Sequence, residues 1–389
     1  MSLIRAKEDE VRMIYQKKVH IINFSRKLTV TTIFFLIPLY FLKIGFSGWQ
    51  IGLIISLYAF APILFSFPTG WINDRISIKR VIQGGFLLQG LAFLLLGMTI
   101  NFFLMAILFL LLGVANNALD VSTNSLYFKD ETQQDLNKKY SRLTFWLALG
   151  PAFGILLGGI LIYLSNFHTL FYLYSLFVLV VLVLIGDIGK EKFESVSIRE
   201  YKLDLFNRKT ILFSIMIFML GLHWGVEGTV YSPFLEKYFH LNNLQVALYI
   251  SLSLFALAFS AFFIGLLKYN AKLNKRLFLI AMSLSGLGLM LMVNRSVYLS
   301  FLFRVVHEVG DGFFGALNVL FISRLFEKRS IGGSSGVLLA MMTLGHMVGA
   351  LIFSPLGFRE GLQYPFIISG SLLVANSIFG IYVFKKSQY

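Results

Sequence analysis

The sequence predicts an all-α polytopic membrane protein, with twelve transmembrane helices in two six-helix, pseudo-symmetric halves. Three observations predict this fold. First, 57% of the residues are hydrophobic and only 14% are charged. Apolar runs near twenty residues recur along the chain, and every second connection between these runs is rich in lysine and arginine. A run of that length spans about 30 Å of hydrocarbon. It must be helical there because lipid offers the backbone no hydrogen-bond partners.

The apolar runs define twelve spans. The first run follows some twenty mostly polar residues and precedes no small-residue cleavage site, so we interpret it as a retained helix rather than a signal peptide. The predicted spans are 21–42, 49–72, 80–98, 102–128, 143–164, 169–187, 210–235, 244–267, 277–293, 297–323, 332–355 and 364–384.

Lysine and arginine lie almost entirely on one side of these spans. The N-terminal segment, the even-numbered connections and the C-terminus hold 29 of the 34 basic residues, whereas the odd-numbered connections hold four. The positive-inside rule therefore predicts a multi-pass protein of the cytoplasmic (inner or plasma) membrane with both termini in the cytosol. The same asymmetry accounts for the net charge of +15 without nucleic acid as a partner.

Several classes of chemistry are excluded or disfavoured. The chain has no cysteine, which excludes disulfides and thiolate metal sites. It lacks a Walker loop, a His-Glu-x-x-His motif and a Gly-x-Ser-x-Gly motif. His307 and Asp311, four residues apart, are too few to define a metal site. We therefore expect no enzyme, no cofactor and no metal, with a membrane-embedded sensor or enzyme as the alternative from another class.

The longest connection, 189–209, separates an N-terminal half (1–188) from a C-terminal half (210–389), and we expect it to be a cytosolic, interfacial amphipathic linker. Short strings recur between the halves at offsets of 198, 195 and 195, which favours duplicated halves as in many secondary transporters. The recurring strings are Ala118-Leu119-Asp120-Val121 with Ala316-Leu317-Asn318-Val319, Gly150 and Gly154 with Gly345 and Gly349, and Gly70 and Arg80 with Gly265 and Lys275.

The connection between the second and third spans carries a family resemblance. It reads Gly70-Trp-Ile-Asn-Asp74-Arg75-Ile-Ser77-Ile-Lys79-Arg80. This string resembles the signature loop of the major facilitator superfamily, although Ser77 stands where a second glycine is usual and Ile78 replaces a basic residue. The resemblance implies that fold, and it implies that Asp74 helps to latch the cytosolic face. The alternative is a plain positively charged turn.

Two further strings imply opposite directions of transport. Gly150-Pro151-Ala-Phe-Gly154 in the fifth span resembles an element of proton-driven antiporters in this superfamily, whereas 118–124 resembles a segment of sugar-type uptake members. Physically, Pro151 kinks a helix and the glycines allow close helix packing, which is the alternative interpretation. Symport and antiport therefore stay open.

Ionisable side chains at membrane depth are costly and mark functional sites. In the tenth span Arg304, Glu308 and Asp311 follow one helical face, and Arg304 is placed to pair with Glu308. Counting 1.5 Å per residue puts Glu227 level with Glu308 and His223 level with Asp311. The residues predicted to bind substrate or couple protons are Glu227, Asp311, Glu308, Arg304, His307, His223, Asn117 and Asn124. A static salt-bridge network is the alternative.

A second group is predicted near the cytosolic mouth. Asp120 lies at a level similar to that of Arg26 and Lys27, which favours a gate pair over a substrate contact. The predicted cytosolic gate comprises Gly70, Asp74, Arg75, Arg80, Asp120 and Arg26. His346 takes the place of Pro151 in the repeat, and we interpret it as a packing histidine.

The sequence thus predicts a secondary active transporter that moves a small organic solute by alternating access, as a monomer among membrane lipids, with protons as the coupling ion. An uncoupled facilitator, or a flippase for an amphiphile or lipid, is the alternative with the same fold. An organic cation, a zwitterion and a polyol all fit the predicted charges.

Overall fold

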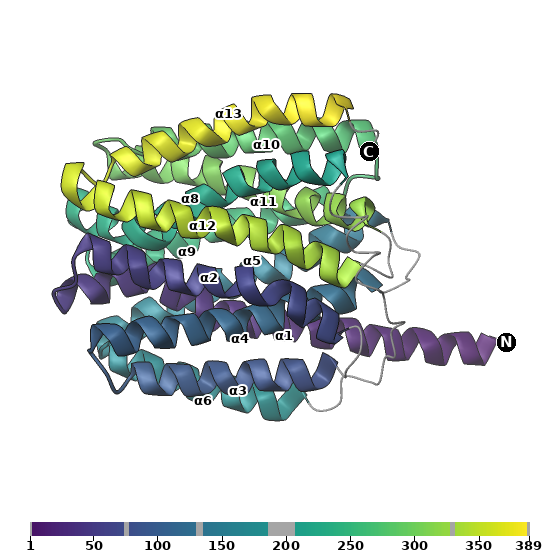
Figure 1. The fold of residues 1–389 in the computed structure, drawn as a ribbon, viewed down its shortest axis with the longest axis horizontal. Coiled ribbons are helices and arrows are strands. Elements are labelled where there is room, and N and C mark those ends of the chain that lie inside the picture. The colour runs from purple at the N-terminus through teal and green to yellow at the C-terminus, as the bar shows by residue number, and fades with distance from the viewer. Residues whose placement is uncertain (1, 74–77, 130–134, 186–206, 327–330, 387–389) are drawn as a thin grey trace.

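The computed structural model describes residues 2–73, 78–129, 135–185, 207–326 and 331–386 (Figure 1). Within these ranges the chain forms twelve helices and no strand. The helices are α1 (Ser2–Lys43), α2 (Gly48–Asn73), α3 (Ile78–Leu96), α4 (Phe102–Lys129), α5 (Leu136–Leu164), α6 (Phe167–Ile185), α8 (Arg208–Phe239), α9 (Asn243–Ile264), α10 (Ala271–Leu291), α11 (Val297–Leu325), α12 (Ile331–Glu360) and α13 (Tyr364–Lys386). The predicted all-α fold is confirmed.

The helices form one elongated bundle, and both termini lie at the same end of it (Figure 1). Eleven of the twelve described helices are long and apolar enough to cross a membrane. The exception, α10, carries Lys272, Lys275 and Arg276 in its first two turns, which lowers its mean hydropathy. It still packs along α11 and α13 inside the bundle (Figure 1), so it belongs to the same array as the other eleven helices.

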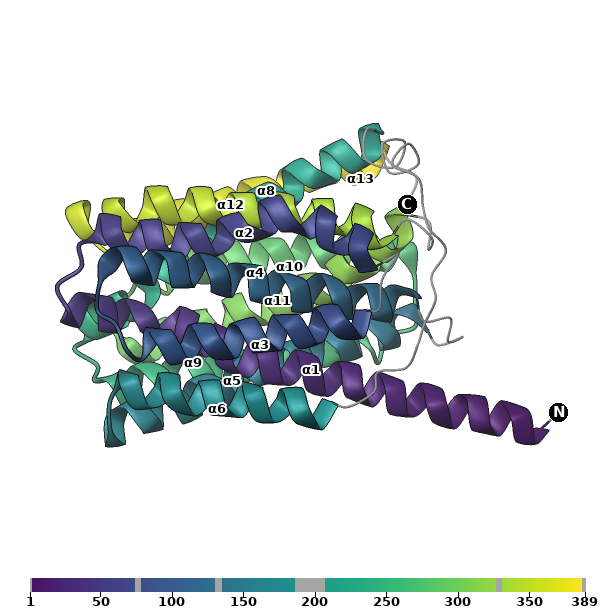
Figure 2. The same ribbon diagram turned by 60° about the horizontal axis from the view of Figure 1, so that its bottom comes forward.

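Each predicted span corresponds to one helix. Some observed helix ends differ from the predicted span ends because of the local sequence. Helix α1 begins at Ser2 and runs out beyond the bundle (Figure 2), because the charged segment before residue 21 contains neither glycine nor proline. Helix α5 begins at Leu136, earlier than predicted, because the Asp135 side chain accepts hydrogen bonds from two backbone amides of its first turn. Most of the predicted linker lies outside the described residues.

The glycine repeat forms equivalent helix contacts in the two halves. Gly150 and Gly154 of α5 face α1, where a Cβ at Gly154 would collide with the Leu28 carbonyl. Gly345 and Gly349 of α12 face the backbone of α8 in the same way. Because only glycine permits such close backbone approach, the repeated glycines fix α5 against α1 and α12 against α8.

Two helix pairs form the main contacts between the halves. Helix α2 lies beside α12 (Figure 1), where Ser354 Oγ donates to the Gly48 carbonyl at 2.6 Å. Helix α5 lies beside α9, where Ser251 Oγ donates to the Ala152 carbonyl at 2.7 Å. These hydroxyl–carbonyl bonds connect the halves through short side chains, so the backbones come close together.

The predicted topology can be tested by cysteine labelling, because the chain has no cysteine of its own. Ile198→Cys lies in the predicted cytosolic linker, and we expect an impermeant thiol reagent outside intact cells to leave it unlabelled. Asn101→Cys, in the exposed connection between α3 and α4, is the matched control and should label. Labelling of position 198 from outside would overturn the orientation.

Candidate functional site

Six ionisable side chains gather between α8 and α11 in the second half. The most exposed of them, Asp311, is only 7% exposed. The residues are His223 and Glu227 of α8 and Arg304, His307, Glu308 and Asp311 of α11. The structure thus brings together the six charged and imidazole residues that the sequence analysis assigned to substrate binding or proton coupling; we refer to them as the α8–α11 cluster.

Arg304 lies between two carboxylates. Its Nη1 is 2.5 Å from Glu227 Oε1, and its Nη2 is 2.5 Å from Glu308 Oε1. Its guanidinium also lies over the ring of Tyr231, 4.2 Å from the ring centroid. The predicted pair with Glu308 is confirmed, and Glu227 reaches the same cation across the helix interface. Because arginine stays charged, these two acids have a permanent counter-ion.

Asp311 depends on imidazoles instead. Its Oδ2 is 3.3 Å from His223 Nε2 and 3.6 Å from His307 Nε2. His307 Nε2 also lies 3.1 Å from Glu227 Oε1. A histidine forms an ion pair only when it is protonated, so the counter-charge of Asp311 varies with proton occupancy.

The other nitrogen of each imidazole faces a backbone carbonyl. His307 Nδ1 is 2.9 Å from the Ser285 carbonyl, and His223 Nδ1 contacts the Leu220 carbonyl. A carbonyl can only accept, so each Nδ1 donates and Nε2 is left as the nitrogen that gains or loses a proton. Ser285 Oγ also donates to Asp311 Oδ1 at 2.5 Å. Both variable nitrogens therefore face the carboxylates.

The formal charges of the cluster balance only when protons are added. Three carboxylates and one guanidinium leave two negative charges if both imidazoles are neutral. Protonation of both histidines would bring the total to zero. Because the cluster is buried, an uncompensated net charge there would be costly.

The same atoms also meet the spacing of a metal site. The ligand atoms of two groups lie within 4.8 Å of one another, namely His223–His307–Asp311 and Glu227–His307–Glu308. In the second group the Arg304 guanidinium already contacts both carboxylates and would repel a cation. The first group offers two nitrogens and one carboxylate, a set that a divalent transition metal accepts.

A second ion pair lies in the first half, between α1 and α4. Arg26 Nη2 is 2.6 Å from Asp120 Oδ1, as predicted for the gate pair. Arg26 also donates to Asn23 at 2.9 Å and to Asn116 at 3.2 Å, and Asn124 donates to Asp120 at 3.2 Å. Asn124 therefore belongs to this ion pair rather than to the α8–α11 cluster. A gating role for the pair stays a prediction.

The remaining predicted residues lie elsewhere. Asn117 accepts from Ser66 at 2.6 Å and donates to Thr69 at 3.3 Å, so its amide ties α4 to α2. Gly70 is buried near the end of α2, and Arg80 is exposed in the first turn of α3. Asp74 and Arg75 lie outside the described residues.

Two residues of the site were not predicted from the sequence. Tyr231 lies one helical turn after Glu227, and that i, i+4 spacing on α8 could have indicated it. Ser285 comes from α10, which carries no charge at that depth, and nothing in its sequence context indicates contact with Asp311.

Comparison with known proteins decides the family. The sequence profile of the Major Facilitator Superfamily matches residues 19–222 and again 213–388. The chain belongs to the major facilitator superfamily. It is therefore a multi-pass secondary transporter and not an enzyme.

Other proteins of this superfamily share its fold. The human organic anion transporter MFSD10 (TETRAN) superposes with a TM-score of 0.73 at 13% identity, covering 94% of this chain and 99% of that one. The nucleoside transporter NupG superposes with a TM-score of 0.72 at 14% identity, covering 96% and 100%. The inner membrane protein YqcE of Escherichia coli (strain K12) is 38% identical over 52 residues, which span 13% of this chain and 12% of YqcE.

Proposed function

We propose that this transporter moves a small organic solute by alternating access and couples the movement to protons through the α8–α11 cluster. The observation that carries the proposal is the charge balance of that cluster. Glu227 and Glu308 share a permanent cation, whereas Asp311 pairs with imidazoles whose charge requires a proton. When the halves move and the exposure of the cluster changes, its affinity for protons must change as well.

Alternating access is supported by the positions of the two charged groups. The Arg26–Asp120 pair joins α1 to α4 in the first half, and the α8–α11 cluster joins equivalent helices of the second half. The two halves meet mainly along α2 with α12 and α5 with α9, so the charged groups lie on helices between those joints. Rocking of one half against the other would change access to both groups.

The direct test is transport by purified full-length protein in liposomes, with and without an imposed pH gradient. Proton coupling predicts that the gradient drives the solute above its equilibrium concentration. An uncoupled facilitator would equilibrate the solute equally in both conditions. A lipid flippase would instead redistribute a labelled lipid between the leaflets. The assay is then repeated with added Zn²⁺. Loss of the gradient-driven accumulation would show that a metal competes with protons at His223, His307 and Asp311.

For the solute, we propose a molecule that bears an acidic group. Lys27 is half-buried in α1, and no hydrogen bond or ion pair joins it to any other described residue. From Lys27 to Phe34, the partly exposed residues of α1 are Lys27, Thr31 and Phe34, which lie on one helical face. That face looks toward the second half, because the Phe34 ring lies 5.1 Å from the ring of His346 on α12.

A cation on that face with no hydrogen bond or ion pair to another described residue favours an anionic or zwitterionic solute over an organic cation. The acids of the α8–α11 cluster are already paired with cations of the same cluster, which leaves Lys27 to bind an external carboxylate or phosphate. MFSD10 is named an organic anion transporter, but at 13% identity that likeness concerns the fold. The proposal therefore rests on Lys27.

Lys27→Gln should raise the KM for an acid-bearing solute about tenfold, because a charge-assisted hydrogen bond is lost. We expect Lys17→Gln, an exposed position on the same helix, to leave KM unchanged. Initial rates of uptake into liposomes over a concentration series measure both. An unchanged KM in the Lys27 variant would mean that Lys27 does not contact the solute.

A further inference from the structure

Helix α1 carries a row of side chains that face the inside of the bundle. The row consists of Lys27, Thr31 and Phe34, which are partly exposed and lie on one helical face. In α1, 78% of the residues in the apolar segment are buried, the largest share among the eleven helices that could cross a membrane. A partly exposed side chain on such an enclosed helix faces other helices of the bundle rather than lipid.

The Phe34 ring meets three other helices. Its centroid lies 5.1 Å from that of the His346 ring on α12 and 6.0 Å from that of the Tyr58 ring on α2. On α8 the facing residue is Gly228, where a Cβ would collide with the Phe34 ring. Phe34, Tyr58 and His346 thus form an aromatic group at a junction of the two halves, and we refer to these three residues as the aromatic trio.

The hydroxyl of Thr31 makes no hydrogen bond to another described residue. The two other threonines of this stretch of α1 behave differently. Thr29 Oγ1 donates to the Arg26 carbonyl at 3.2 Å. Thr32 Oγ1 donates to the Leu28 carbonyl at 2.5 Å. Thr31 therefore keeps a donor and an acceptor for another molecule.

His346 brings an unsatisfied nitrogen to the aromatic trio. Its side chain is only 5% exposed, and its Nε2 is buried without a hydrogen-bond partner among the described residues. Packing against Phe34, the role expected from the sequence, leaves this nitrogen unsatisfied. Because a buried polar atom without a hydrogen bond is costly, a partner supplied by a bound molecule would be favoured there.

We propose that the solute of this transporter is an aromatic acid that binds along this row. Its acid group pairs with Lys27, its ring packs against Phe34 and Tyr58, and a polar substituent on the ring bonds to His346. Lys27 and Phe34 are seven residues apart, about 10 Å along the helix axis, which leaves room for one ring between the acid and the substituent. Aromatic rings attract one another through their faces and edges. The inference rests on the proposed role of Lys27 and adds the ring.

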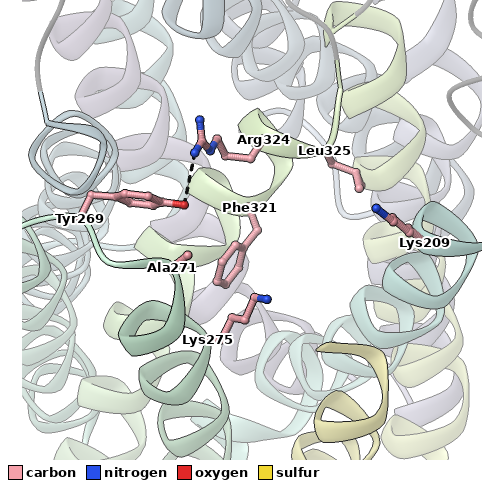
Figure 3. A pocket seen from close by; sticks show the side chains of 7 residues that line it. All are labelled: Lys209, Tyr269, Ala271, Lys275, Phe321, Arg324 and Leu325. Carbon is pink, nitrogen blue, oxygen red and sulfur yellow. Dashed lines mark hydrogen bonds between the residues drawn. The ribbon is translucent and has the colours of Figure 1, made fainter. Parts of the chain in front are cut away.

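A pocket elsewhere in the bundle is less suited to an acid. It has a volume of about 260 Å³ and opens among α8, α10 and α11, at the end of the bundle where the chain termini lie (Figures 1 and 3). Lys209, Lys275 and Arg324 line it, and we refer to it as the basic pocket. The Arg324 guanidinium turns to Tyr269, whose phenol oxygen is 3.5 Å from Nη2 (Figure 3). Lys209 and Lys275 also interact with other residues, so these cations are already engaged.

The test is equilibrium binding to the purified full-length protein in an uncharged detergent, measured by titration calorimetry. The ligands are 4-hydroxyphenylacetate, phenylacetate and cyclohexylacetate. All carry the same acid group, the first adds a polar substituent to the ring, and the last has a ring of similar size that is not aromatic. The wild type should bind phenylacetate about fivefold more tightly than cyclohexylacetate. It should bind 4-hydroxyphenylacetate about fivefold more tightly again.

Two variants assign these preferences to the aromatic trio. Phe34→Leu keeps an apolar side chain but should remove the preference for phenylacetate over cyclohexylacetate. His346→Leu should remove the preference for 4-hydroxyphenylacetate over phenylacetate. Each preference is a ratio of two affinities on one protein, so a partial loss of folded protein does not alter it. Phe103→Leu is the matched control, because Phe103 is 74% exposed on α4, and it should keep both preferences.

Lys27→Gln separates the ring site from the proposed role of Lys27. It should weaken the binding of all three acids about equally and keep both preferences. If it does so while the wild type binds phenylacetate and cyclohexylacetate equally, the ring site is overturned and the role of Lys27 stands. Preferences that survive in the Phe34 and His346 variants would also overturn the ring site. If Lys27→Gln binds all three acids as the wild type does, or if the wild type binds none, both proposals are wrong.

Discussion

Asp311→Asn and Glu227→Gln transporters, reconstituted in liposomes, should lose all solute accumulation driven by a pH gradient while still exchanging labelled for unlabelled solute. Asp311 is the acid whose counter-ions are the two imidazoles, so an amide there removes the carboxylate that faces His223 and one of the two that face His307. Glu227→Gln removes the second carboxylate that faces His307 and leaves Arg304 paired with Glu308. Exchange needs no net proton movement, so it should persist.

Accumulation and counterflow are measured on the same proteoliposomes, so that the two activities are compared at equal protein content. Glu236→Gln is the matched control, because it removes an acid from the same helix outside the cluster. It should accumulate solute as the wild type does. If both cluster variants still concentrate solute in response to the gradient, the α8–α11 cluster is a structural network and the coupling site lies elsewhere.

Arg304→Met should lower the stability of the folded protein by about 3–5 kcal/mol, because it leaves Glu227 and Glu308 buried without a permanent counter-ion. Removing one member of a buried ion pair costs far more than replacing the whole pair with uncharged groups. A triple variant, Arg304→Met with Glu227→Gln and Glu308→Gln, should therefore recover much of the lost stability.

Thermal unfolding in detergent, read together with the yield of monodisperse protein, measures both variants. The matched control is Arg359→Met, since Arg359 pairs with Glu360 at 3.1 Å but its side chain is 86% exposed. Such a surface pair contributes little, so the control should unfold close to the wild type. Equal stability of the Arg304 variant and the control would mean that the two acids are protonated in the resting protein.

The sequence by itself determined the features that depend on local composition and spacing. Hydrophobic runs set the number of spans, because the width of the bilayer fixes how many apolar residues a helix needs. Contacts within one helix could also be predicted from the sequence, since residues four apart share a helix face. The pairing of Arg304 with Glu308 follows from that rule alone. The glycine repeat likewise indicated close helix packing before the partner helices were known.

Only the tertiary structure decided which faces of different helices meet. The contacts of Glu227 with Arg304, of both histidines with Asp311 and of Ser285 with Asp311 join separate spans. They depend on how each helix is rotated about its axis, and an apolar span surrounded by lipid and other apolar helices carries little in its sequence to set that rotation.

The unknown rotation of each helix also explains why some polar side chains make contacts that the sequence did not predict. Asn117 follows the helical face of Asp120 in the sequence, yet its amide bonds to α2 because α2 lies close enough to receive it. The basic pocket is a second case, since Lys209, Lys275 and Arg324 come from three connections that simple charge counting assigned to one membrane side. Charge counting places such residues on a face of the membrane, and helix packing alone brings them to the lining of one pocket.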